Sequence, residues 1–321
     1  MAKILGLLFS IAYGFFIIVY VQRDFFLGSG DIDSYVFYFD EFETWIDFSN
    51  AYADQTYFSF TPDSPIKGEG VFRLSVLLLR GLLNQSTLTI LGYLAFIMSS
   101  ILFCIYAINI RSRKYLFYIL PLFLMVFFTP RIMNLFASGI RSGIAFTILM
   151  VAIIYLKGAK KYILFALSSL FHLSMVPIIS LYFIFYMLDN KRIKSSFIAS
   201  LFILLLCSFL AAIAGKEFHF SIGVSQSIYY MSLVFVVGLF IIFTNKNGIK
   251  NLYGFMSAGL ILIIFFGYTM DFSFIRYIGN AIILYLFFLI KEGEVRTIQV
   301  FTISYVPFFI LTLYYSIANY W

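Results

Sequence analysis

The chain has 321 residues, of which 62% are hydrophobic and 12% are charged, and its formal net charge is +7 at pH 7. Apolar runs of about 20 residues, the length that crosses a bilayer core, recur from end to end, which excludes a soluble globular protein and predicts an all-α polytopic membrane protein. The basic residues are scattered between these runs rather than clustered on a soluble face, so the positive charge does not indicate a nucleic-acid partner.

Apolar runs and basic connections together predict the topology. The first run, residues 3–21, is too long for a signal-peptide core and no small-residue cleavage site follows it, so we expect it to remain as the first span. The positive-inside rule places Lys3 and the short basic connections in the cytoplasm. These connections are Arg111–Lys114, Lys157–Lys161, Asp189–Lys194, Asn245–Lys250 and Lys291–Arg296. The predicted spans are 3–21, 88–110, 115–130, 137–156, 195–214, 226–244, 252–268, 276–290 and 298–318. We therefore expect about nine full transmembrane helices in a single transmembrane domain, residues 1–321.

Residues 22–87 are predicted to form an external loop rich in acidic and aromatic side chains. Carboxylates beside rings such as Tyr35 suit sugars, because sugar hydroxyls donate hydrogen bonds and sugar C–H faces stack on rings. An ordinary solvated loop with interface-seeking aromatics is the alternative. The carboxylates in the loop are Asp24, Asp31, Asp33, Asp40, Glu41, Glu43, Asp47, Asp54, Asp63 and Glu69. Near the end of the loop, VFRLSVLLLRGLL is too short to span and carries Arg73 and Arg80, which predicts an external amphipathic helix at the outer surface.

Arginine is in excess on the predicted outer side. The basic residues that topology does not assign to the cytoplasm are Arg23, Lys67, Arg73, Arg80, Arg131, Arg141, Lys216 and Arg276. Topology needs only positive charge, whereas a planar guanidinium binds phosphate or carboxylate through two parallel hydrogen bonds, so the excess indicates a phosphorylated ligand at the outer face. Pairing with the acidic loop or with lipid headgroups is the alternative, which we favour for Arg23, Arg73 and Arg80.

Arg141 is expected about five residues inside the span 137–156, which otherwise carries no charge. A cation at that depth needs a partner or water. Gly139 and Gly143 stand in a GxxxG spacing around it, which is typical of close helix packing, and small neighbours would also leave room for a ligand.

The segment 162–188 has basic flanks at both ends but is too short for two complete crossings at 1.5 Å per residue. We expect a re-entrant hairpin, or two short helices, with Phe171–Ser174 at the tip and Pro177 helping to break the helix. One long tilted span is the alternative. In both versions His172 lies within the membrane region, where it could move a proton or, when charged, stabilise an anion.

The outer-facing zone is expected to gather His172 and Arg141 with Asp271 and Arg276 of TMDFSFIRY around one cavity. No HExxH, paired CxxC, Walker loop, GxSxG or dinucleotide fingerprint occurs, so metallohydrolase, ATPase and redox functions have no support and no cofactor is expected. Asp31 and Asp33 could nevertheless hold a metal.

Several short motifs occur in an order that resembles the EpsG-like branch of Wzy-type polysaccharide polymerases, and the resemblance covers nearly the whole chain. Ser142 stands where the family often shows Gln, and Gly70 stands where a Pro often follows the glutamate, which leaves the acceptor specificity open. The motifs are DxDxY (Asp31, Asp33, Tyr35), Glu69 before a short outer helix, IRxGIA (Ile140, Arg141, Gly143, Ile144, Ala145), FHxS (Phe171, His172, Ser174) and FxRY (Phe274, Arg276, Tyr277).

The resemblance implies a multi-pass enzyme of the bacterial inner membrane whose active site faces the periplasm. Its donor and acceptor would be undecaprenyl-diphosphate-linked oligosaccharides in membrane lipid, with a chain-length regulator and a flippase as possible partners. We nominate His172 as the base that deprotonates the attacking hydroxyl, with Asp31, Asp33 or Glu69 as rivals. Arg141 and Arg276 are the predicted diphosphate clamp, and the further substrate-binding candidates are Arg131, Arg73, Tyr35 and Tyr277.

Other functions remain as alternatives. A transporter or flippase of the same lipid-linked sugar would also need arginines, but it should show broken helices in corresponding places of two repeats, and no internal repeat is found. A ligase, a transferase that uses a polyprenyl-phosphate sugar, and a non-enzymatic assembly partner are the others.

Overall fold

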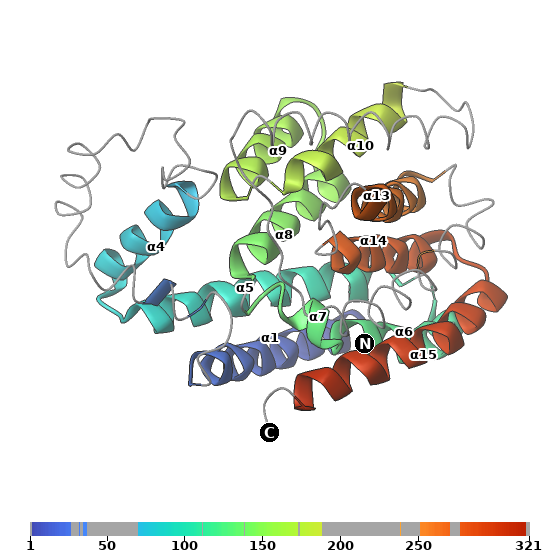
Figure 1. The fold of residues 1–321 in the computed structure, drawn as a ribbon, viewed down its shortest axis with the longest axis horizontal. Helices are drawn as coiled ribbons and strands as arrows, with labels where there is room; N and C mark the ends of the chain where they lie inside the picture. Colours follow the sequence, from blue (N-terminus) through green and yellow to red (C-terminus); the bar gives the residue numbers. More distant parts are fainter. Residues whose placement is uncertain are drawn as a thin grey trace. The chain divides into compact units, whose positions relative to one another are not determined.

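The computed structural model is helical, and no strand occurs among the residues that it describes, which are 2–26, 32, 35–36, 70–110, 112–137, 139–172, 174–187, 238, 251–269 and 277–318. For Arg73 and several residues at helix ends only the backbone is described. Figure 1 shows the helices, which are α1 (Ala2–Phe26), α4 (Gly70–Leu83), α5 (Thr87–Ile108), α6 (Arg113–Phe127), α7 (Pro130–Met133), α8 (Ile140–Tyr155), α9 (Ala159–Phe171), α10 (Met175–Met187), α13 (Leu252–Thr269), α14 (Tyr277–Glu292) and α15 (Val295–Ala318).

Length and apolar composition identify a helical membrane protein. Within the described ranges, three segments are long and apolar enough to cross a membrane: Gly6–Arg23, Thr87–Ile108 and Val295–Tyr314. Shorter apolar helices include Tyr115–Phe127 and Ile140–Tyr155. Seven of the nine predicted spans coincide with helices α1, α5, α6, α8, α13, α14 and α15, whereas 195–214 and 226–244 lie outside the described residues. The number of about nine spans stays a prediction.

The chain divides into two compact units, each described by itself. The first contains Met1–Ile108 and Met133–Val176, and the second contains Asn109–Ile132 and Pro177–Trp321. The expectation of a single transmembrane domain stays a prediction.

In the first unit, α1 and α5 pack side by side as an antiparallel pair (Figure 1). Small residues set the close approach: a Cβ at Gly6 would lie 3.1 Å from Ala107 Cβ, and a Cβ at Gly14 would collide with the Ser100 hydroxyl. The two helices are antiparallel, because the later position on α1, Gly14, lies against the earlier position on α5, Ser100, while Gly6 lies against Ala107. Small residues at such interfaces are what membrane helices use, since lipid supplies no hydrophobic force between them.

Helices α8 and α9 form an antiparallel hairpin in the same unit. The connection is short, and Gly158 within it has a φ of +59°, a left-handed conformation that suits glycine. The Ser168 hydroxyl on α9 donates a hydrogen bond of 2.7 Å to the Ala145 carbonyl on α8, and both groups are buried. Helix α5 covers α8, with Thr147 donating to the Met98 carbonyl at 3.4 Å. The hairpin therefore has a fixed register.

The second unit is built around α14. Its residues from Tyr277 to Ile290 are all buried, which is the pattern of a helix packed on every side. On one side the Ser257 hydroxyl of α13 donates to the Ala281 carbonyl at 2.7 Å. On another, the Tyr115 hydroxyl of α6 donates to the carbonyls of Leu289 and Gly293, the second at 2.9 Å. Helix α15 packs against α6, and just after the end of α6 the Thr129 hydroxyl shares a hydrogen bond of 2.8 Å with the Tyr305 hydroxyl of α15.

One boundary differs from the sequence expectation and bears on the site. Helix α8 begins at Ile140 rather than at residue 137, so Arg141 lies in the first helical turn and not about five residues deep. The preceding residues form turns instead: the Gly139 amide donates to the Asn134 carbonyl at 2.6 Å, and the Ala137 amide donates to the Met133 carbonyl at 3.1 Å. The Gly139 amide reaches back five residues rather than four, so the chain turns before Ile140 but does not follow the α-helical pattern there.

Candidate functional site

The guanidinium of Arg141 lies over the ring of Tyr35, with the Arg141 Cζ 5.0 Å from the ring centroid. Arg141 is half-buried, and Tyr35 is buried. Such cation–π contacts contribute about 0.5–2 kcal/mol, and more when they are shielded from water. Two of the predicted substrate-binding residues, Tyr35 from the segment before α4 and Arg141 from α8, are thus in contact.

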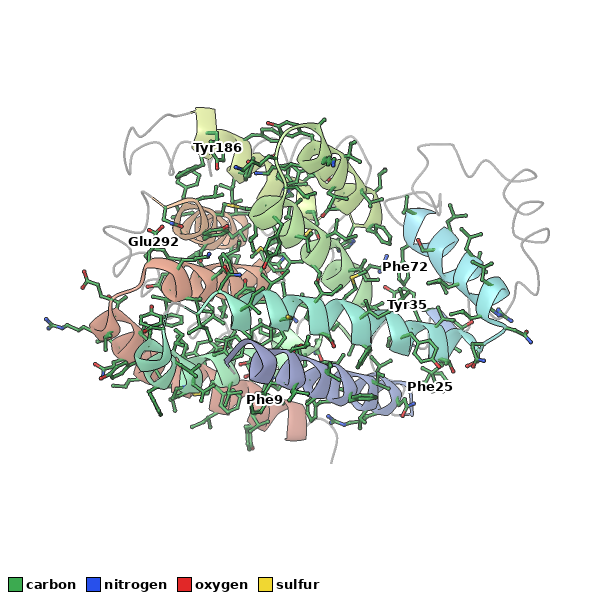
Figure 2. All side chains as sticks on the ribbon, turned by 180° about the vertical axis from the view of Figure 1, so that it is seen from behind. Phe9, Phe25, Tyr35, Phe72, Tyr186 and Glu292 are labelled. Atoms are coloured by element: carbon green, nitrogen blue, oxygen red, sulfur yellow. The ribbon has the colours of Figure 1, made fainter. Side chains whose placement is uncertain are left out.

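Phe72 on α4 completes this aromatic support. Its ring meets the ring of Tyr35 edge to face at a centroid distance of 5.4 Å, and Phe72 has no exposed surface. Figure 2 shows the two labelled rings against each other beside α4. Edge-to-face packing orients the Tyr35 ring, because the positive ring edge prefers the negative face. The Tyr35 ring therefore contacts both the Phe72 ring, which orients it, and the guanidinium of Arg141.

The turn before α8 is packed tightly against the first turns of that helix. A Cβ at Gly143 would fall on the Leu135 carbonyl oxygen and would lie 2.8 Å from Phe136 Cδ1, and a Cβ at Gly139 would lie 2.9 Å from the Asn134 carbonyl oxygen. The two glycines of the GxxxG spacing therefore allow the turn at residues 134–136 to pack directly against the start of α8. The expectation that these glycines leave room for a ligand is wrong, because protein atoms already occupy the space.

His172 lies at the same level as Arg141 along the α8–α9 hairpin. Ala145 follows Arg141 by four residues, and Ser168 precedes His172 by four, so each residue is one helical turn, about 6 Å, beyond the Ser168–Ala145 hydrogen bond. Because the two helices are antiparallel, both steps lead toward the same end of the hairpin. That end is opposite the connection at 156–158, which belongs to a predicted cytoplasmic segment.

The helix breaks at His172, inside the segment where a tip was expected. Helix α9 ends at Phe171 and α10 begins at Met175. The His172 backbone is extended, its amide donates to the Ser168 carbonyl, and its carbonyl accepts from the Met175 amide at 3.0 Å. The His172 side chain is half-buried. The placement of 162–188 in the membrane as a re-entrant hairpin stays a prediction.

The remaining predicted site residues belong to the second unit, are described by their backbone alone, or lie outside the described residues. Arg131 in α7 is half-buried and Tyr277 at the start of α14 is buried, and both belong to the second unit. Arg73 is in α4, where its backbone alone is described. The others, Asp31, Asp33, Glu69, Asp271 and Arg276, lie outside the described residues.

Sequence reasoning missed Phe72, which contacts Tyr35, and Asn134, which lies in the turn before α8. Phe72, which orients Tyr35, was hidden in an apolar run that predicted only a surface helix. Asn134 has a buried side-chain oxygen with no hydrogen-bond partner in the part of the chain that the structure describes, and its backbone carbonyl binds the Gly139 amide. A polar residue three positions after the Pro130–Arg131 pair and before an apolar stretch was the available signal for Asn134.

This arrangement can bind an anion and handle a proton at one end of a hairpin. The first turn of α8 presents backbone amides without a side-chain cap from Gly139, and the positive end of the helix dipole adds to the charge of Arg141. Arg141 brings a planar guanidinium to this end of the hairpin, and a guanidinium can bind one phosphate through two parallel hydrogen bonds. His172 supplies an imidazole at the same level.

Comparisons with family models, with curated proteins and with solved structures find no match for this chain.

Proposed function

We propose that the protein is a glycosyltransferase that polymerises undecaprenyl-diphosphate-linked oligosaccharide repeat units at the outer face of the bacterial inner membrane. The observation that carries the proposal is a half-buried arginine, Arg141, held over the Tyr35 ring at the end of an apolar hairpin that also ends in His172. The likeness of its short motifs to the EpsG-like polymerases adds to this. A lipid-linked substrate suits a site that is carried by membrane helices.

The reaction requires the protein to stabilise the leaving group and to remove a proton. A hydroxyl of the acceptor sugar attacks the anomeric carbon of the donor, and the bond from that carbon to the diphosphate oxygen breaks. Arg141 stabilises the negative charge that grows on the departing diphosphate, with Arg276 as its proposed second arm. His172, or one of Asp31, Asp33 and Glu69, takes the proton of the attacking hydroxyl.

Binding an anion through Arg141 would be assisted by its setting. In a half-buried site the effective dielectric constant is lower than in water, so a guanidinium and a phosphate attract each other more strongly than at an exposed surface. The Tyr35 and Phe72 rings hold the guanidinium in place before the ligand arrives, which lowers the entropy lost on binding.

The test is a purified assay with a defined undecaprenyl-diphosphate oligosaccharide, scored by the ladder of products on a gel. Wild-type protein should give bands of several repeats. Arg141→Lys keeps the charge but loses the planar pair of donors, which are worth about 1.5–3 kcal/mol, so chain growth should slow by about 10- to 100-fold. Unchanged growth in that variant would refute the assigned role of Arg141.

Arg23→Lys is the matched control. Arg23 also lies over a tyrosine, with its Cζ 5.3 Å from the Tyr20 ring centroid, but it is at the end of α1. It should keep the wild-type ladder. The same assay separates the alternatives: a flippase forms no new glycosidic bond, a ligase adds one block to a different lipid acceptor, and a transferase that uses polyprenyl-phosphate sugars adds single sugars.

A further inference from the structure

Helix α4 has two faces, and its charged face is turned toward the protein. Phe72 and Val76 have no exposed surface, Leu77 is 7% exposed and Arg80 is half-buried. At 3.6 residues per turn, positions 72, 76 and 80 lie along one side of the helix, and positions 73 and 77 adjoin them. Positions 73 and 80, which carry the arginines of α4, therefore lie on the helix face that holds the buried positions. Helix α4 contacts α5 and α9 of the same unit.

The opposite face of α4 is apolar and open. Val71, Leu74, Leu78 and Leu82 recur at spacings of three and four and so form one row, which we call the outer row. Leu78 is 47% exposed and Leu82 is 79% exposed. A Cβ built on Gly81, beside this row, meets no atom within 4 Å. Among the described residues, the carboxyl-terminal end of the outer row is therefore uncovered at Gly81 and Leu82.

We infer that the outer row of α4 lies in the hydrocarbon of the bilayer, while the arginine positions face the protein. Water is an unfavourable neighbour for such a row, because apolar side chains that stay in contact with water lose the free energy that burial would give. At 14 residues, α4 is about 21 Å long and too short to cross the membrane, so it occupies one leaflet.

Lipid is favoured over other partners because α4 packs on a helix that is itself long and apolar enough to span the membrane. Helices α1 and α5 of the same unit are long and apolar enough to span, and they too carry exposed apolar side chains, among them Phe15 at 59%, Val19 at 63% and Ile97 at 46%. Helix α4 packs on α5. A bilayer that surrounds α5 therefore reaches the helix that lies against it.

This orientation differs from that of an ordinary interfacial helix, which turns its basic residues toward headgroups and its apolar face inward from the surface. In α4 the arginine positions lie on the face that packs against protein. The inference does not depend on the proposed enzymatic function, and its test uses no activity.

The test is a nitroxide scan of α4 in the full-length protein, reconstituted in phosphatidylcholine vesicles. Cys104 and Cys207 are replaced by alanine, and single cysteines are placed in turn at residues 74–82. Collision rates with oxygen, which concentrates in hydrocarbon, and with a water-soluble nickel complex are measured by electron paramagnetic resonance. Oxygen access should peak at positions 74, 78 and 82, should be least at 76 and 80, and should exceed nickel access several-fold at the peaks.

Gln85 provides the aqueous control, because it is exposed in the turn between α4 and α5. Nickel access at Leu82 equal to that at Gln85 would show a water-facing row and would overturn the inference. Low access to both reagents at Leu78 and Leu82 would show a protein partner, such as a second copy of the chain, and would also overturn it. A maximum of oxygen access at 76 and 80 would reverse the assigned faces. Leu82 is the most exposed position of the row, so a label there should not disturb folding.

Discussion

The tight turn before α8 predicts that two glycine-to-alanine changes in the same unit will differ in their effect on stability. Gly143 and Gly81 both lie in helices, so alanine brings each the same intrinsic gain of about 1 kcal/mol. At Gly81 the new methyl group meets nothing within 4 Å. At Gly143 it would fall on the Leu135 carbonyl oxygen and lie 2.8 Å from Phe136 Cδ1, where ordinary contact begins at 3.4 Å.

The two changes therefore differ by the cost of the clash alone. The Phe136 ring would need to move by about 0.6 Å, and the Leu135 carbonyl belongs to backbone held by the hydrogen bonds of the turn. Overpacking of this kind costs about 1–3 kcal/mol. Gly81→Ala should thus be more stable than the wild-type protein, and Gly143→Ala should be less stable than Gly81→Ala by about 1–3 kcal/mol.

The assay is thermal unfolding of both variants in the same detergent, followed by far-ultraviolet circular dichroism. At about 2 °C per kcal/mol for a chain of this size, Gly143→Ala should melt about 2–6 °C below Gly81→Ala. Equal melting temperatures, or a higher one for Gly143→Ala, would refute the packing of the turn against α8. Gly143→Ala should also lower the chain growth proposed above, because the turn that it displaces adjoins Arg141.

Two further predictions concern buried hydrogen bonds in the second unit. Ser257→Ala removes the donor to the Ala281 carbonyl and should destabilise the protein by about 0.5–1.5 kcal/mol in the same melting assay, whereas Ser304→Ala, whose exposed hydroxyl bonds to its own helix at Val300, should be neutral. Tyr115→Phe keeps the ring but removes the hydroxyl that donates to the Leu289 and Gly293 carbonyls, and it should destabilise the protein by about 1–3 kcal/mol. Tyr118, which is 43% exposed, should tolerate the same change, and equal melting temperatures for the two phenylalanine variants would count against these hydrogen bonds.

The positions of the helices could be predicted from the sequence because solvent and period dictate them. In a bilayer every backbone donor must be satisfied within the segment, so each long apolar run between basic connections had to be helical. The start of α8 was missed for a local reason. Leu135, Phe136 and Ala137 continue the apolar run, but they form turns that pack on α8, and hydropathy alone does not distinguish a buried turn from a helix.

The contacts of the candidate site were harder to predict than its residues. Arg141 and His172 could each be singled out, because a charged or titratable residue at membrane depth is costly. The Tyr35–Arg141 contact joins segments far apart in the chain, and no local pattern encodes it. Phe72 is one aromatic among many in a chain with 21% aromatic residues, so only the folded structure distinguishes it.

The register of the α8–α9 hairpin links the two singled-out residues more firmly than their motifs do. The Ser168–Ala145 hydrogen bond fixes how far α9 slides along α8, and the helix break at His172 ends α9 at the level where α8 begins. An arginine in the first turn of one helix and a histidine just after the last turn of the other then occupy the same end of the hairpin. Slippage by one helical turn would carry them about 5.4 Å apart along the axis. The buried hydroxyl of Ser168 thus sets the level of His172 relative to Arg141 without belonging to the site itself.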